Sequence, residues 1–235
     1  MNLNFLISDL KKQANPIKAK NCLWFFKTKK REYGYGDKFL GLTNPEIRSL
    51  VKKYQKLINL SEVISLLENP YHECRLTALL ILVAQYSQGD NRTKKLIFNL
   101  YLSHTAFVNN WDLVDLSARD IIGKYCYEQQ DCSILYGLSK SKDLWEKRIS
   151  MIATSFYVKN NNFTPTINIS KTLLKDNHDL IHKAVGWMLR EVGKRDQKTL
   201  TNFLDKHALH MPRTALRYSI ERLPESLRLY YLTLK

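Results

Sequence analysis

Apolar side chains recur every three or four positions through most of the chain, which is the spacing of one face of an α-helix. Clear alternation of apolar and polar residues is hard to find, and eight glycines and six prolines are few for 235 residues. Short polar breaks such as "ENP", "SQGDN" and "NNNFTPTIN" separate the apolar segments, as expected of stacked helical hairpins. The pattern predicts an all-α protein whose clearest helices lie around residues 62–67, 73–86, 93–101, 107–125, 144–157, 180–192, 200–207 and 214–222.

Four helical segments align with one another without gaps: "CRLTALLILVAQY", "NWDLVDLSARDII", "KRISMIATSFYVK" and "KAVGWMLREVGKR". Their second residues, Arg75, Trp111, Arg148 and Ala184, lie 36, 37 and 36 positions apart. That period is typical of HEAT-like helical pairs, which stack so that equivalent positions line one surface. We therefore predict a HEAT-like helical-repeat solenoid (α-α superhelix) with a concave basic face, forming a single domain over residues 1–235. The alternative is a long helical chain whose spacings only resemble repeats.

The charge of the chain indicates its partner. Lys and Arg number 37 against 22 Asp and Glu, a formal charge of +15, which predicts attraction to nucleic acid or to an anionic membrane surface. No apolar run is long enough to span a membrane, and the first twenty residues lack the pattern of a secretory signal, so we expect a soluble, cytoplasmic protein.

The four cysteines show no C-x-x-C spacing and are expected to be reduced, mostly buried thiols rather than metal ligands.

One stripe of the aligned repeats gathers unusual side chains. Trp111 and Arg148 occupy the same aligned position, Trp187 lies three residues beyond it in the last repeat, and Asp115 four residues beyond it in its own. Positions three and four residues apart share a helix face, so the four side chains are expected to converge. Two indoles beside one carboxylate would suit a flat cation and would repel a phosphate. An acid within a basic surface is better explained by positive charge that develops during a reaction than by affinity alone.

Structural alternatives exist for each of these residues. Either tryptophan would also fit a helix interface as a core residue. Asp115 would also fit a salt bridge with Arg148 or Arg119, and Asp112 would also fit the cap of a helix start.

Several stretches resemble the AlkD-like DNA alkylation repair family, whose members are HEAT-like-repeat DNA glycosylases. They are "FLGLTNPEIRSLVKKY", "VNNWDLVDLSA", "LWEKRIS", "HKAVGWMLREVGK" and "MPRTALRYSIERL", spread over nearly the whole chain. The resemblance implies hydrolysis of the N-glycosidic bond of positively charged alkylated purines, such as 7-methylguanine and 3-methyladenine, without turning the base into a pocket. It places the catalytic aspartate on Asp115, the two aromatic contacts on Trp111 and Trp187, and the arginine on Arg148.

The resemblance also implies a monofunctional enzyme without cofactor or metal, acting as a monomer on double-stranded DNA that contains alkylated bases. No membrane, no obligate protein partner and a location in the bacterial cytosol, associated with the nucleoid through DNA, are expected with it. One alternative is a non-catalytic HEAT-like protein that binds damaged or branched DNA, and a second is a protein-interaction adaptor. Intact Asp115 and both tryptophans favour the enzyme.

DNA contacts are predicted from basic and helix-start residues. In "GLTNPEIRSLVKKY", Thr43 or Asn44 is expected to cap a helix with Pro45 in its first turn and Glu46 completing a capping box. The segment at residues 27–38, "KTKKREYGYGDK", predicts a loop near DNA, although a merely solvated charge run is the equal alternative. The predicted DNA-binding residues are Thr43, Asn44, Arg48, Lys52, Lys53, Lys29, Lys30, Arg31, Lys183, Arg190, Arg213 and Arg217.

Overall fold

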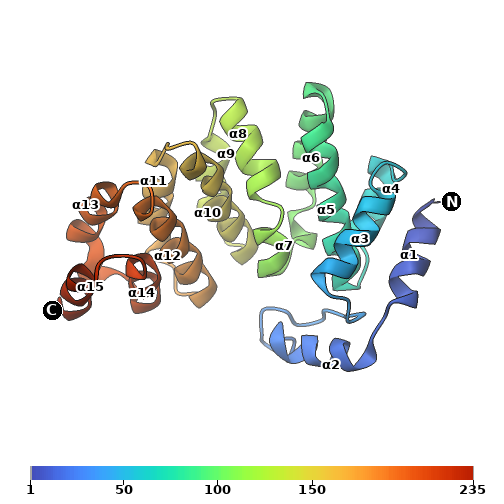
Figure 1. Cartoon of the computed structure of the whole chain (residues 1–235), viewed down its shortest axis with the longest axis horizontal. Coiled ribbons are helices and arrows are strands. Elements are labelled where there is room, and N and C mark those ends of the chain that lie inside the picture. The colour runs from blue at the N-terminus through green and yellow to red at the C-terminus, as the bar shows by residue number, and fades with distance from the viewer. Residues whose placement is uncertain (1, 235) are drawn as a thin grey trace. The chain divides into compact units, whose positions relative to one another are not determined.

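The computed structural model describes residues 2–234, and regular structure within them is helical (Figure 1). The chain contacts divide it into two compact units, residues 1–117 and residues 118–235, and each unit is described by itself below. The all-α, helical-repeat fold predicted from the sequence is therefore confirmed. The organisation of residues 1–235 as a single functional domain stays a prediction.

The first unit is built around one helix that is buried on nearly every side. Its elements are α1 (Asn2–Lys12), α2 (Pro16–Phe25), α3 (Asn44–Tyr54), α4 (Leu60–Leu67), α5 (His72–Gln88), α6 (Asn91–Ser103), the 3₁₀ turn η1 (Thr105–Phe107) and α7 (Trp111–Asp115). Helices α1, α3, α4, α6 and α7 all contact α5. Burial of a leucine or isoleucine in such a helix stabilises the fold by about 1.5–3 kcal/mol per side chain, and α5 buries a continuous run from His72 to Leu82.

Helix starts in this unit follow from local sequence. Asn15, the residue before α2, accepts a hydrogen bond from the Lys18 amide. Pro16 suits the first turn of α2 because proline has no N–H to leave unpaired. The predicted capping box at the start of α3 is present: Glu46 accepts hydrogen bonds from the amide and the hydroxyl of Thr43, at 2.6 and 2.7 Å. A second capping box, not predicted, joins Asn59 and Glu62 at the start of α4.

The second unit packs around two long helices. Its elements are the π-helical turn η2 (Arg119–Gly123), α8 (Lys124–Glu128), α9 (Ser133–Ser139), α10 (Leu144–Lys159), α11 (Thr164–Leu173), α12 (Asp179–Gly193), α13 (Gln197–His207), the 3₁₀ turn η3 (Ala208–His210), α14 (Arg213–Ile220) and α15 (Glu225–Thr233). Helix α10 contacts η2, α8, α9, α11 and α12, and α12 contacts α13 and α14. At Gly186 a Cβ atom would lie 2.4 Å from the Cβ of Tyr218, so glycine allows α12 and α14 to approach this closely.

One predicted helix is wrong. The apolar period over residues 107–125 predicts a single helix, whereas the structure has η1, an extended Asn110, then α7, turns at residues 116–118, η2 and α8. The break before α7 follows from Asn110, whose buried side chain accepts a hydrogen bond from the Trp111 amide and donates one to Asp37. A long-range contact thus starts a new helix at Trp111 where local periodicity would continue the old one. The other predicted helices fall within α4, α5, α6, α10, α12 and α13, and mostly within α14.

All four cysteines are free thiols; Cys74 and Cys126 are buried, and Cys22 and Cys132 are partly exposed. Across residues 2–234, no helix combines the length and the apolar character that crossing a membrane requires.

Candidate active site

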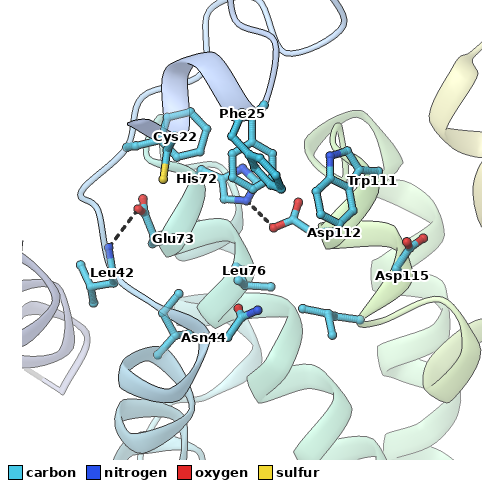
Figure 2. A pocket seen from close by; sticks show the side chains of 14 residues that line it. Cys22, Phe25, Leu42, Asn44, His72, Glu73, Leu76, Trp111, Asp112 and Asp115 are labelled. Atoms are coloured by element: carbon cyan, nitrogen blue, oxygen red, sulfur yellow. Dashed lines mark hydrogen bonds and ion pairs between the residues drawn. The ribbon is translucent and has the colours of Figure 1, made fainter. Parts of the chain in front are cut away.

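A pocket of about 360 Å³ lies in the first unit, between α2, the segment before α3, and helices α3, α5 and α7 (Figure 2). Its walls are mostly apolar, with a few acidic groups among them. Its lining residues are Cys22, Phe25, Phe26, Phe39, Leu42, Asn44, Ile47, His72, Glu73, Leu76, Trp111, Asp112, Asp115 and Leu116. Two residues of the predicted site, Trp111 and Asp115, and one predicted DNA contact, Asn44, therefore share one cavity.

Trp111 and Asp115 are brought to the pocket by α7, the short helix that begins at the tryptophan. They are four residues apart, about one helical turn, so both side chains project from the same side of α7. Both are partly exposed, in contrast to Leu113 and Val114 of the same helix, which are completely buried. The apolar side of α7 thus faces the core, and its other side presents an indole and a carboxylate to the pocket.

Aromatic rings form one wall of the pocket. Phe26 stacks on Trp111 with ring centroids 5.5 Å apart and on Phe39 at 5.1 Å. Phe25 meets the Trp111 ring edge-on at 5.7 Å, and Figure 2 shows these two rings side by side at the pocket. Each ring restrains its neighbours, so the indole of Trp111 is held in a fixed orientation by the α2 segment.

Behind this wall lies a buried pair formed by His72 at the start of α5 and Asp112 of α7. His72 Nε2 lies 2.8 Å from Asp112 Oδ2, an interaction drawn in Figure 2, and Nδ1 lies 3.4 Å from Asp37 Oδ2. Burial alone would lower the pKa of His72, but the charge and hydrogen bond of Asp112 and the hydrogen bond of Asp37 outweigh it and raise the pKa to about 9. At neutral pH the imidazole is therefore a cation between two carboxylates.

Asp37 ties the loop after α2 to this buried pair. Its Oδ1 accepts a 2.7 Å hydrogen bond from Arg75, and Asn110 Nδ2 lies 3.4 Å from Oδ2. Burial raises the pKa of Asp37, but His72, Arg75 and Asn110 together lower it below its ordinary value. Because Asn110 precedes α7 and Asp112 lies within it, the network anchors the start of the helix that carries Trp111 and Asp115.

Glu73 organises a second part of the pocket. Its carboxylate accepts hydrogen bonds from the backbone amides of Leu40, Gly41 and Leu42 at 2.9, 2.7 and 3.3 Å. These amides belong to the segment that leads into α3, so Glu73 fixes where α3 begins. Asn44, the first residue of α3, is consequently held at the pocket.

The charge of the lining favours a cation. Three of its side chains are carboxylic acids, Glu73, Asp112 and Asp115, and one is the imidazole of His72; none of the lining residues is a lysine or an arginine. With His72 protonated, three negative charges and one positive charge leave a formal −2 at the pocket. Backbone amides donate to Glu73, and His72 pairs with Asp112. Asp115 lies on the partly exposed side of α7. An aromatic wall next to these acids attracts flat, positively charged groups.

The other two predicted catalytic residues lie in the second unit. Arg148, on α10, is buried, and its Nη1 donates a 2.6 Å hydrogen bond to the backbone oxygen of Leu180. Trp187, on α12, is partly exposed. Their catalytic roles stay predictions. Arg119, one of the two arginines considered as a salt-bridge partner of Asp115, donates two hydrogen bonds to Asp120.

The predicted DNA-binding residues differ in their exposure and in their ion pairs and hydrogen bonds within the protein. Thr43, Arg48, Lys52, Lys29, Lys30, Arg31, Arg213 and Arg217 are exposed. Lys53 is also exposed but forms an ion pair with Asp9 at 2.7 Å. Lys183 pairs with Asp179 at 2.8 Å, Arg190 pairs with Glu221, and Arg213 donates to the Leu232 backbone oxygen. Contact of each with DNA stays a prediction.

Sequence reasoning missed His72, Glu73, Phe25 and Phe26, which line this pocket, and Asp37, which lies beside His72. The sequence does carry a signal for His72 and Glu73, the pair "HE" at the start of a strongly apolar helix. Polar side chains in the first turn of a buried helix need buried hydrogen-bond partners, so the pair predicts a polar cluster there. No periodic signal marks Asp37, which lies in a loop.

Comparisons with known proteins match both the sequence and the fold of this chain. A family model for DNA alkylation repair enzymes matches residues 6–223. A solved structure described as a predicted DNA alkylation repair enzyme from Enterococcus faecalis superposes with a TM-score of 0.70 at 16% sequence identity, covering 91% of this chain and 98% of the other. At that identity the likeness shows the fold alone. No curated protein matches the sequence significantly.

Proposed function

Because the chain belongs to the DNA alkylation repair enzyme family, we propose that it is a DNA glycosylase that releases positively charged alkylated purines from duplex DNA. The observation that carries this proposal is the shared pocket of Trp111 and Asp115, an indole and a carboxylate one helical turn apart in an aromatic cavity. The basic charge of the whole chain, +15, supports DNA as the partner.

The proposed reaction matches the chemistry of the lesions. Alkylation at N7 of guanine or N3 of adenine makes the base a cation, and cleavage of its bond to the sugar releases it as a neutral leaving group. Protonation of the base is therefore not needed, and a strong general acid is not required. The electron pair of the glycosidic bond moves to the base, and positive charge develops on the deoxyribose.

Asp115 is proposed to act on that developing charge. Two opposite unit charges about 4 Å apart attract each other by about 4 kcal/mol at the effective dielectric of a protein surface, so one well-placed carboxylate can lower the barrier substantially. The same carboxylate would orient the water that forms the new bond to C1′ and accept the proton that this water loses. Trp111 and Phe25 would hold the sugar and the cationic base by contact with their rings.

The remaining parts of the proposal rest on the family resemblance. Trp187 would supply a further aromatic contact, and Arg148 would orient the acid or bind a phosphate. The base would stay in the helix during cleavage instead of being turned out. The enzyme would act as a monomer, without a cofactor, and would leave the DNA strand uncut.

Release of 7-methylguanine from methylated duplex DNA tests the proposal. The wild-type chain is expected to release the base, and Asp115→Asn is expected to lose at least about tenfold in rate, because removal of one charge-stabilising group costs that or more. Asp120→Asn is the matched control: it makes the same change five residues further along, at an acid paired with Arg119 outside the pocket lining, and is expected to keep wild-type activity.

Two results would refute the glycosylase, and a third would refute the role of Asp115. DNA binding without base release would favour a non-catalytic protein that recognises damaged or branched DNA. Neither binding nor release would favour a protein-interaction adaptor. Equal activity of Asp115→Asn and the wild type would exclude the carboxylate as the charge-stabilising group.

A further inference from the structure

Helix α2 exposes large apolar side chains and buries none of its residues. Trp24 is 71% exposed, Phe25 54% and Ile17 76%, and Tyr35 in the loop that follows is 67% exposed. Exposure of several large apolar side chains in one segment marks an interaction site more often than isolated exposed residues do. Figure 1 shows α2 in the first unit, joined to α1 and α3 by the segments that flank it.

The charges around these rings are strongly positive. Within residues 16–38 the basic side chains are Lys18, Lys20, Lys27, Lys29, Lys30, Arg31 and Lys38, all exposed. The two acids of the segment are already engaged, since Asp37 pairs with Arg75 and Glu32 accepts a hydrogen bond from the Lys29 amide. Lys27 Nζ lies 5.4 Å from the Trp24 ring centroid, which places a cation and an aromatic face in the same spot. The segment therefore complements a polyanion that also offers flat rings.

The loop at residues 27–38 has a defined backbone conformation, which an unstructured run of solvated charges would lack. Its backbone closes through hydrogen bonds from the Gly34 amide to Lys27 O at 3.0 Å and from the Thr28 hydroxyl to Leu23 O at 2.9 Å. Lys27 and Arg31 adopt left-handed conformations, with φ of 55° and 73°, which non-glycine residues adopt only where surrounding contacts hold them. The exposed aromatic and basic side chains are thus presented on a defined scaffold.

We propose that α2 and the loop at residues 27–38 form a platform that binds an unpaired DNA nucleotide. Trp24 stacks on the base of that nucleotide, and the lysines and the arginine of the segment bind the neighbouring phosphates. This proposal rests on the proposed function and adds a substrate preference to it. An intact duplex covers the faces of its bases, so an exposed indole or phenol ring can stack face to face on a base only where that base has left the stack. Phe25, the next residue after Trp24, lines the pocket, so a base on the platform would belong to the same DNA as the nucleotide at the pocket.

A membrane surface fits the segment less well. A helix that lies in a membrane interface gathers its apolar side chains on one face and its charges on the other. On α2, Ile17 and Trp24 lie seven residues apart on one side together with Lys20, while Phe25 lines the pocket. The apolar side chains of α2 therefore do not form one continuous stripe.

Binding to undamaged DNA tests the platform independently of base release. The probes are a fluorescent duplex with two unpaired thymidines, the same duplex without them, and vesicles of anionic phospholipid. Trp24→Ala is expected to weaken binding of the bulged duplex at least about fivefold, the effect of losing one base–aromatic stack, while binding of the flush duplex changes less than about twofold. Trp24→Phe is expected to retain most of the affinity, because a ring remains. Tyr230→Ala removes a similarly exposed ring from α15, 54% exposed, and is expected to change neither affinity.

The outcomes separate the two proposals. Equal weakening of both duplexes by Trp24→Ala would show a general DNA contact and overturn the preference for an unpaired nucleotide. No change in either duplex would overturn the platform, and a loss confined to vesicle binding would assign the surface to membranes. Because none of these DNAs contains an alkylated base, a protein without glycosylase activity can still show the preference, and an active glycosylase can still lack it.

Discussion

Protonation of His72 should make the stability of the protein depend on pH in a window where few other groups titrate. The imidazole is buried between Asp112 and Asp37, and its pKa is raised from 6.5 to about 9 in the folded chain. A group whose folded pKa exceeds its unfolded pKa contributes stability that is fully present below the unfolded value and is lost as pH rises through the folded value. His72 therefore stabilises the fold most below pH 6.5 and loses that contribution by about pH 9.

The magnitude follows from the shift. Between the two pKa values the folded chain holds one proton more than the unfolded chain, so the free energy of unfolding falls by about 1.4 kcal/mol per pH unit. From pH 7 to pH 8.5 the loss is roughly 2 kcal/mol. Other shifted groups act outside this window: burial lowers the pKa of His178 and of His207 below 6.5, and burial raises the pKa of Cys74 and of Cys126 from 9.0 to about 12.

Chemical unfolding at several pH values measures this slope. His72→Gln keeps a hydrogen-bonding side chain but cannot carry the charge, so its free energy of unfolding is expected to stay nearly constant from pH 7 to 8.5. His210→Gln changes an exposed histidine and is expected to keep the wild-type slope. Nuclear magnetic resonance gives a direct reading, because the ring signal that His72→Gln removes should titrate with a midpoint near 9. A midpoint at or below 6.5, or identical slopes in the wild type and His72→Gln, would refute the cation between two carboxylates.

Other predictions follow from the pocket and from the charge. Glu73→Gln is expected to lower the free energy of unfolding by about 2 kcal/mol, because the acceptor of three amide hydrogen bonds loses its charge and one of its two oxygens becomes an NH2 group that cannot accept; an unchanged denaturation midpoint would contradict this. Gly41→Ala is expected to destabilise by at least about 1 kcal/mol, since φ is +85° and the new Cβ would lie 2.2 Å from Asn15 O; a variant as stable as the wild type would exclude that close approach. DNA affinity is expected to fall linearly with salt on logarithmic axes, as phosphate contacts release counterions, and an affinity insensitive to salt would count against DNA as the partner.

The sequence alone determined the elements whose causes are local. An apolar period of three to four residues predicts the buried face of each long helix, and the structure confirms the all-α, helical-repeat fold. The capping box of Thr43 and Glu46 is readable because its partners are three residues apart. The spacing of Trp111 and Asp115 predicts that both share one face of a helix, and both line one pocket.

Only the tertiary structure decided how distant polar groups pair. His72 meets Asp112 across 40 positions, Asp37 meets Asn110 across 73, and neither pairing leaves a periodic signal. The contacts of Asn110 interrupt the helix predicted over residues 107–125 and start α7 at Trp111, because a buried side-chain hydrogen bond outweighs local helical preference. The sequence likewise does not predict that α2 is exposed, because its content of apolar residues is also that of a buried helix. Periodicity reports which side of a helix is apolar, whereas packing decides what covers that side and which charges meet behind it.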